Sequence, residues 1–237
     1  MSSLAQSALP NTMRRRALYA LIGAIFIFVI ALPAPDLIAG VIPYLIEGHY
    51  TFAFRTMQAL TVAAMFIFII VTRTLLVWGY AHWAKRRDLF RARMDLTRVD
   101  VGWCIVAAIA AIAINMIQSH FSGEPHQFTW VAFIRYWGML PGIGNTILQY
   151  IYYVTEGFAV IWIVDAFQNA GEYAIPRLRF PWGALGLMAT WGIAHYLSKD
   201  LQTAIYVTLT ACIIGLLYFA NRKDVWPPLI LWLVMTV

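Results

Sequence analysis

The chain consists of apolar runs about as long as a bilayer is thick, separated by short charged segments. A helix needs about 20 apolar residues to cross a hydrocarbon core about 30 Å thick. Within lipid, only helices and closed barrels satisfy every backbone N–H and C=O group. Since 62% of the residues are hydrophobic and only 12% are charged, against roughly 25% charged in soluble domains, we predict an all-α integral membrane protein.

About seven of these runs are candidates for membrane-spanning helices. They cover residues 17–46, 57–83, 101–119, 139–168, 181–197, 201–220 and 225–237. Pro33 and Pro35 are expected to break the first run, because proline interrupts the helical hydrogen-bond ladder. The last run is so short that its crossing stays open. No linker divides the chain, so we predict one membrane domain over 1–237, a polytopic helix bundle.

The placement of Lys and Arg predicts the orientation, because cytoplasmic loops carry an excess of these residues. With a cytoplasmic N-terminus, Arg55, Arg135 and Lys199 fall on the outer side. The inner side then holds most of the others: Arg14, Arg15, Arg16, Lys85, Arg86, Arg87, Arg91, Arg93, Arg98, Arg177, Arg179, Arg222 and Lys223. We therefore expect a multi-pass protein whose basic residues contact the lipid bilayer, and the net charge of +6 does not indicate a nucleic-acid partner.

Several polar residues lie inside the apolar runs, where an ionisable group is costly and marks a candidate functional site. At about 100° per residue, Asn145, Gln149, Tyr152 and Glu156 fall within about 40° of a common direction. Such a stripe either forms hydrogen bonds between helices or serves a function. Asp165 lies about 180° from Glu156, so these carboxylates do not form a paired site on this helix.

Arg73 also lies within an apolar run, at nearly the same depth as Glu156. At about 1.5 Å of rise per residue, their depths differ by only a few ångströms. We therefore expect Arg73 to pair with Glu156. The alternative is that the long side chain of Arg73 extends toward the cytoplasmic face.

The C-terminal third holds an ordered set of motifs. A run containing Glu156 is followed by Trp191-Gly192-Ile193-Ala194-His195, then by Ile-Ile-Gly-Leu-Leu-Tyr-Phe at 213–219 and Val-Trp-Pro-Pro-Leu-Ile-Leu at 225–231. This order resembles the CPBP family, the intramembrane proteases named for CAAX prenyl proteases and bacteriocin-processing proteins. The resemblance covers residues 150–237 and implies a CAAX-protease-like core there.

The first motif of that family is Glu-Glu-x-x-x-Arg. Glu156 matches its first carboxylate, whereas Gly157 replaces the second and Ile161 replaces the arginine. Arg73 would then supply the positive charge that Ile161 lacks.

The other two family motifs are Phe-x-x-x-His and a last-helix His-x-x-x-Asn or His-x-x-x-Asp. Trp191 and His195 match the former with an exchange of aromatic residue, while Trp232 and Thr236 stand where the last helix should carry its His and its Asn or Asp. The spacing of the last motif is kept, but its chemistry is different.

The resemblance implies a peptidase in which Glu156 and His195 activate water and the last helix stabilises the oxyanion. Losing one oxyanion donor typically costs about 100-fold to 1000-fold in rate, and only the indole N–H of Trp232 and the hydroxyl of Thr236 could replace the missing donors. A catalytic zinc needs three protein ligands, and only Glu156 and His195 are in register. We therefore expect no metal and no other cofactor.

Three functions remain open. In the first, the chain is a divergent or inactive relative of these endopeptidases that acts on or binds a membrane peptide or protein partner. In the second, it is an active glutamate- and histidine-dependent intramembrane protease. In the third, it is a transporter or membrane-complex subunit. The last is suggested by the polar stripe alone.

Overall fold

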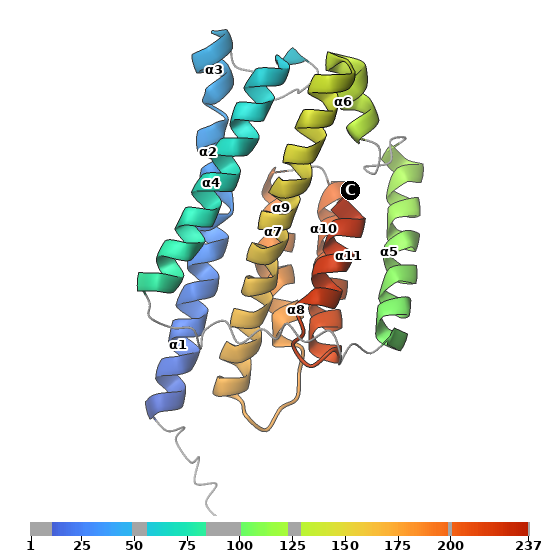
Figure 1. Cartoon of the computed structure of the whole chain (residues 1–237). Coiled ribbons are helices and arrows are strands. Elements are labelled where there is room, and N and C mark those ends of the chain that lie inside the picture. Colours follow the sequence, from blue (N-terminus) through green and yellow to red (C-terminus); the bar gives the residue numbers. More distant parts are fainter. Residues whose placement is uncertain (1–10, 49–55, 84–100, 123–128, 199–200, 237) are drawn as a thin grey trace, which may run out of the picture.

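The structure is a computed structural model that describes residues 11–48, 56–83, 101–122, 129–198 and 201–236, and these form a bundle of helices (Figure 1). The described residues contain no strand. Four helical stretches are long and apolar enough to cross a membrane, and they cover Thr12–Glu47, Ala59–Tyr80, Met139–Ala174 and Leu201–Ala220. Shorter apolar helices cover Val101–Ile114 and Trp226–Met235. The prediction of an all-α protein with membrane-length helices is confirmed, and these helices indicate a membrane protein.

The first apolar run is helical but broken near its middle. It comprises α1 (Asn11–Phe26), the π-helical turn η1 (Ile27–Ala31), α2 (Pro33–Ala39) and α3 (Ile42–Glu47). The N–H of Leu32 donates to the carbonyl of Ile27, five residues back, at 2.9 Å. This wider π pattern occurs as single turns, frequently at functional sites. The break predicted at Pro33 and Pro35 is confirmed, and Asp36 lies in the first turn after it.

The central helix is α7 (Met139–Ala174), with 36 residues. It packs against α1, α4 (Ala59–Trp83), α6 (Thr129–Trp137), α8 (Trp182–Leu187) and α11 (Trp226–Thr236). Its contact with α6 requires a glycine, because a Cβ atom at Gly142 would lie 2.6 Å from the Cα of Ile134. Helix α7 carries Glu156 and packs against α4, which carries Arg73, and against α11, which carries Trp232.

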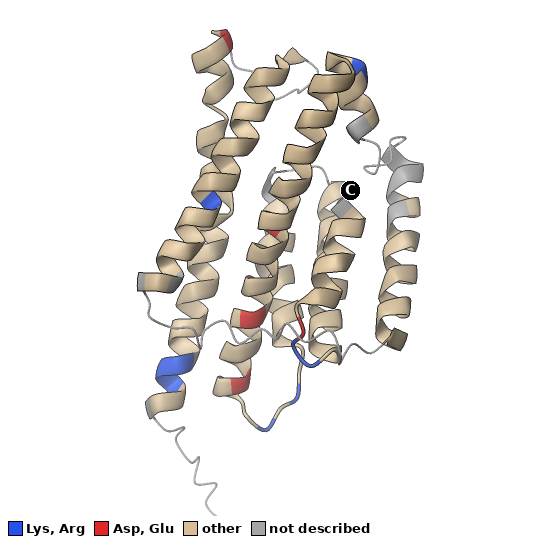
Figure 2. Ribbon diagram, viewed as in Figure 1, with Lys and Arg blue, Asp and Glu red and all other residues tan. Residues whose placement is uncertain are grey.

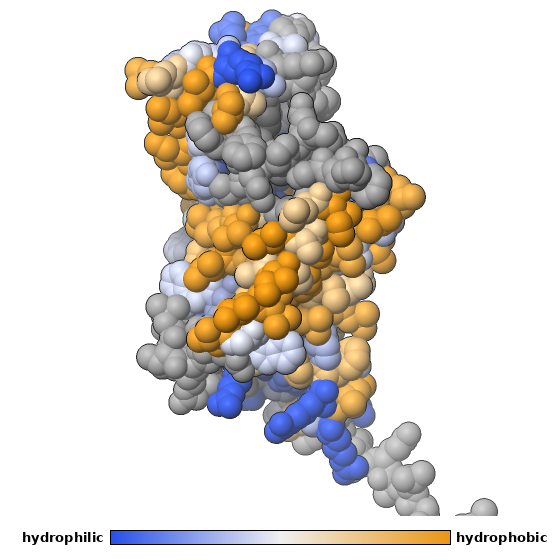
Figure 3. Space-filling view, turned by 90° about the vertical axis from the view of Figure 1, so that its right-hand side faces the viewer, coloured by the Kyte–Doolittle hydropathy of each residue, from blue (hydrophilic) through white to orange (hydrophobic). Residues whose placement is uncertain are grey.

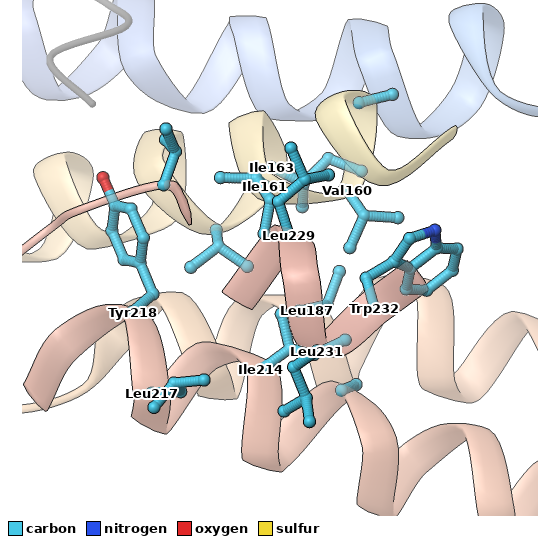
Figure 4. Packing of buried hydrophobic residues seen from close by; sticks show 14 of the residues in the cluster. Val160, Ile161, Ile163, Leu187, Ile214, Leu217, Tyr218, Leu229, Leu231 and Trp232 are labelled. Carbon is cyan, nitrogen blue, oxygen red and sulfur yellow. The ribbon is translucent and has the colours of Figure 1, made fainter. Parts of the chain in front are cut away.

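The C-terminal helices pack beside the lower half of α7 (Figure 1). After α8 come η6 (Met188–Gly192), α9 (Ile193–Ser198) and α10 (Leu201–Ala220), while α5 (Val101–Ser122) packs against α10 and α11. Helices α8 and α10 touch closely, since a Cβ atom at Gly215 would lie 2.3 Å from the Cα of Ala184. The core between α7 and these helices contains Val160, Ile161, Ile163, Leu187, Ile214, Leu217, Tyr218, Leu229, Leu231 and Trp232 (Figure 4).

The surface is apolar along the sides of the bundle and basic at one end. Large apolar side chains are exposed on several helices, for example Leu37, Leu75, Ile109 and Leu140. Figure 3 shows such residues covering the middle of one face, with strongly hydrophilic residues at both its upper and its lower end. In Figure 2 most Lys and Arg of the described residues gather at the lower end. This distribution is the one expected of helices surrounded by lipid tails and headgroups.

Candidate functional site

Arg73 is the centre of a group of charged and polar side chains within the bundle. It lies on α4 and is only 1% exposed. Its Nη2 atom donates to Oδ2 of Asp36 at 2.6 Å and to the carbonyl of Leu32 at 3.4 Å. Its guanidinium carbon lies 4.7 Å from the ring centre of Tyr152. Arg73 thus ties α4 to the broken first helix on one side and to α7 on the other.

Glu156 belongs to the same group but does not form its ion pair. Glu156 is half-buried on α7, and Arg73, Asp36 and Tyr152 act on it electrostatically or by hydrogen bonding. The carboxylate that contacts Arg73 directly is that of Asp36. The expected Arg73–Glu156 pair is therefore corrected, because depth along a helix fixes height but not the lateral neighbour. We call Asp36, Arg73, Tyr152 and Glu156 the charge cluster.

Tyr152 connects the two carboxylates of the charge cluster. Its hydroxyl donates to Oδ1 of Asp36 at 3.3 Å, and Tyr152 lies one turn before Glu156 on α7. A tyrosine hydroxyl has one proton to donate, so it serves only one of these carboxylates at a time. Asp36 thus accepts from both Arg73 and Tyr152 in the arrangement observed.

The polar stripe predicted on α7 serves more than one purpose. Asn145 is buried, and its Nδ2 atom donates to the carbonyl of Ala59 on α4 at 3.1 Å. Gln149 donates through Nε2 to the hydroxyl of Tyr153 at 3.3 Å. Asn145 therefore holds α7 to α4, as interhelical amides do in membranes. The last two residues of the stripe, Tyr152 and Glu156, belong to the charge cluster.

His195 faces a different group of residues, which are aromatic. It is half-buried on α9, its Nδ1 atom lies 2.7 Å from the carbonyl of Trp191, and its ring lies 4.9 Å from the Trp191 ring. A carbonyl only accepts, so this bond requires the proton on Nδ1. The described interactions of Glu156 are with Arg73, Asp36, Tyr152 and Tyr153.

Trp232 fills the space between α11 and α7. It is 1% exposed, its Nε1 atom donates to the carbonyl of Tyr153 at 3.0 Å, and its ring lies 5.1 Å from that of Trp191. A Cβ atom at Gly157 would lie only 2.6 Å from Cδ1 of Trp232. The indole therefore occupies the space that any larger side chain at position 157 would need (Figure 4 shows the neighbouring core).

The other residues of the predicted site add little polar chemistry. Ile161 is fully buried in the apolar core, and so offers no charge at the motif's arginine position. Thr236 ends α11, but its side chain lies outside the described residues. Within the part of the chain that is described, no group of three or more His, Cys, Asp and Glu side chains is arranged to hold a metal ion.

Two polar features were not predicted from the sequence. Asp36 was missed as the partner of Arg73, although an acidic residue after Pro33-Ala34-Pro35 within an apolar run was a usable signal. Asp165 was separated correctly from Glu156, but its partner was not predicted. Asp165 is fully buried, and its Oδ1 atom accepts from the hydroxyl of Tyr218 on α10 at 2.6 Å.

A groove of about 430 Å³ lies between α5 and α10. Its lining is almost entirely apolar: Ile114, Ile117, Leu201, Gln202, Ile205, Tyr206 and Leu209. Neither Glu156 nor His195 is among the lining residues. The groove is therefore a surface for an apolar chain and is separate from the charge cluster.

Comparison of the chain with protein-family models, with curated proteins and with solved structures finds no match. The function is therefore argued from the residues and their contacts.

Proposed function

We propose that this chain is a CPBP-like membrane protein that binds the apolar segment of a membrane peptide or protein partner without hydrolysing it. One observation supports this most strongly. Trp232, at the position of the last-helix histidine, packs on Gly157, at the position of the second motif carboxylate. At the two positions where the family motifs carry reactive groups, the indole of Trp232 instead occupies the space beside Gly157 that a side chain would need.

The polar geometry around this contact also supports binding over hydrolysis. A general base must reach a water beside the scissile bond, and oxyanion donors must be free to meet the developing charge. Glu156 interacts within the charge cluster, and the indole N–H of Trp232 already donates to the carbonyl of Tyr153. Neither group is available in the role that the family motif would give it.

In this proposal, the apolar segment of the partner binds in the groove between α5 and α10. Its lining offers apolar side chains from both helices, including Ile117, Ile205 and Leu209. In lipid, such a surface gains from close packing rather than from the hydrophobic effect, because lipid tails are also apolar. A partner helix therefore competes with lipid through the fit of its side chains.

The proposal also includes the orientation of the chain in the membrane and the number of times that it crosses the bilayer. The basic residues of α1 and of the α7–α8 and α10–α11 connections share one end of the bundle (Figure 2). That end is assigned to the cytoplasm, where Lys and Arg accumulate. The chain then crosses about seven times, with α5, the α8–η6–α9 segment and α11 adding to the four longer helices.

The decisive experiment measures cleavage and binding with the same panel of fluorescent membrane peptides, using full-length protein in lipid nanodiscs. We expect no cleavage, and binding that is unchanged in Glu156→Ala and His195→Ala. Leu209→Trp fills the groove and should weaken binding at least 10-fold. The matched control is Ile67→Trp on α4, since Ile67 and Leu209 are about equally exposed, at 50% and 47%.

Three results would contradict the proposal. Cleavage that disappears in both Glu156→Ala and His195→Ala would establish an active peptidase. Binding that is lost equally in Leu209→Trp and Ile67→Trp would show that the groove is not the site. If no peptide of the panel binds, the proposal that the protein binds an apolar partner segment is wrong.

A further inference from the structure

The charge cluster contains an imbalance of charge inside the membrane-length helices. Asp36 lies in the stretch Thr12–Glu47, Arg73 in Ala59–Tyr80 and Glu156 in Met139–Ala174. With both carboxylates ionised, the one guanidinium leaves a net charge of minus one. An uncompensated charge in hydrocarbon is strongly unfavourable, so the cluster needs one further positive charge.

A metal ion is a poor source of that charge. The guanidinium of Arg73 stands between α2 and α7, 2.6 Å from Asp36 and over the ring of Tyr152, so it would repel a second cation. The described residues offer no group of three or more acidic, His or Cys side chains arranged around a common point. A proton needs no coordination shell and fits directly onto a carboxylate.

The two carboxylates are not equivalent in their contacts. Asp36 accepts from Nη2 of Arg73 at 2.6 Å and from the hydroxyl of Tyr152 at 3.3 Å. Charge-assisted bonds of this kind favour an ionised carboxylate. Glu156 interacts with Arg73 without a direct ion pair to it in the described structure. We propose that the charge cluster is a proton-binding site and that Glu156 carries the proton.

Arg73 also has donors ready for the state in which the proton has left. Its Nε and Nη1 atoms have no hydrogen-bond partner, although the side chain is 98% buried. A carboxylate that turns toward the guanidinium can accept a charge-assisted N–H bond from one of these two atoms. The unpaired donors therefore give deprotonated Glu156 a place to bind, while Asp36 keeps Nη2.

The cluster reaches the surface of the bundle beside a break in a helix. The Asp36 side chain is 39% exposed there. The charged and titratable groups that face Glu156 are Asp36 from α2, Arg73 from α4, and Tyr152 and Tyr153 from α7. The break between η1 and α2 adjoins the site, and broken helices beside ionisable groups are a recurrent form of ion site in membranes.

Infrared spectroscopy of the full-length protein in lipid tests this proposal. A protonated carboxylic acid has a C=O stretching band that shifts in deuterium oxide. We expect such a band near neutral pH, loss of the band at alkaline pH, and its displacement when glutamate is labelled with carbon-13. Glu156→Gln should abolish the band, whereas Glu172→Gln, which removes the carboxylate paired with Lys223, should leave it unchanged.

The variant Asp36→Asn tests whether Glu156 is protonated because of the charge balance of the cluster or because of its burial alone. With Asp36 neutral, Arg73 and Glu156 balance each other, so Glu156 should ionise and the band should disappear near neutral pH. A band that persists in Asp36→Asn would show that burial alone keeps Glu156 protonated, and would overturn the role of the cluster.

Other outcomes would overturn the site itself. These are absence of a glutamic-acid band from wild-type protein at every pH at which it stays folded, or persistence of the band in Glu156→Gln. A band that weakens when sodium is added at constant pH would identify an alkali cation in place of the proton. The labelled wild-type protein shows whether the band comes from a glutamic acid even where a variant does not fold.

Discussion

Replacement of Gly157 by Ala tests whether Trp232 is fitted to α7. An ideal Cβ atom at position 157 lies 2.6 Å from Cδ1 of Trp232 and 2.8 Å from Cδ1 of Leu229, where 3.4–4 Å is ordinary contact. The indole cannot simply turn away, because its N–H donates to the carbonyl of Tyr153 at 3.0 Å. Overpacking costs about 1–3 kcal/mol, while Gly→Ala within a helix gains about 0.5–1 kcal/mol. We expect a net loss of about 1–2 kcal/mol in the free energy of unfolding.

The double-mutant cycle with Trp232→Ala gives the sharper result. Removing the indole should cost about 3–5 kcal/mol by itself. In that background Gly157→Ala meets no ring, and the Leu229 methyl group 2.8 Å away can shift into the space that the indole leaves. The change should then stabilise the protein by about 0.5–1 kcal/mol. The sign of the Gly157→Ala effect therefore reverses, which corresponds to a coupling energy of about 1.5–3 kcal/mol.

The assay is reversible unfolding by sodium dodecyl sulfate in mixed micelles, followed by circular dichroism. Gly144→Ala is the matched control, since it lies on the same helix and its Cβ would meet no atom within 4 Å. The reasoning is refuted if Gly157→Ala behaves like Gly144→Ala, or if its effect is the same with and without Trp232.

The same unfolding assay checks three other contacts. Either Asp36→Arg or Arg73→Asp alone should cost about 3 kcal/mol, and the two together should recover most of it; a double variant as unstable as the sum of the singles would reject this ion pair. Tyr218→Phe removes the 2.6 Å hydrogen bond to fully buried Asp165 and should cost about 1.5–3 kcal/mol, so a loss below about 0.5 kcal/mol would count against it. Gly215→Ala would place Cβ 2.3 Å from helix backbone, which cannot rotate away as a side chain can, and should cost about 3 kcal/mol or more; ordinary stability would show that α8 and α10 can separate.

The helices were largely predictable, because apolar length and charged interruptions determine them. The predicted run 57–83 became Ala59–Trp83, and the run 201–220 was found as Leu201–Ala220. The predicted break in the first run also occurs, and its cause is the missing N–H of proline. Each of these features depends on residues that are close together in the sequence.

The lateral neighbours of a helix were harder to predict. The stripe on α7 was correctly assigned to one face, since Asn145 and Tyr152 both contact α4. Depth alone suggested Glu156 as the partner of Arg73, but Asp36 at the helix break lies closer. Which helix stands beside α4 depends on packing of the whole bundle, and a helical wheel does not contain that information.

The contact between Gly157 and Trp232 links two positions at which the chain differs from the CPBP motifs. A carboxylate at position 157 would collide with the indole, because even a Cβ atom there lies 2.6 Å from it. A histidine at position 232 with Gly157 unchanged would leave part of the indole's volume empty, and cavities are costly in a packed core. A glutamate at position 157 alone, or a histidine at position 232 alone, is therefore expected to lower the stability, so packing couples the two positions. Glu156 lies one residue before this contact and interacts with Arg73, Asp36 and Tyr152.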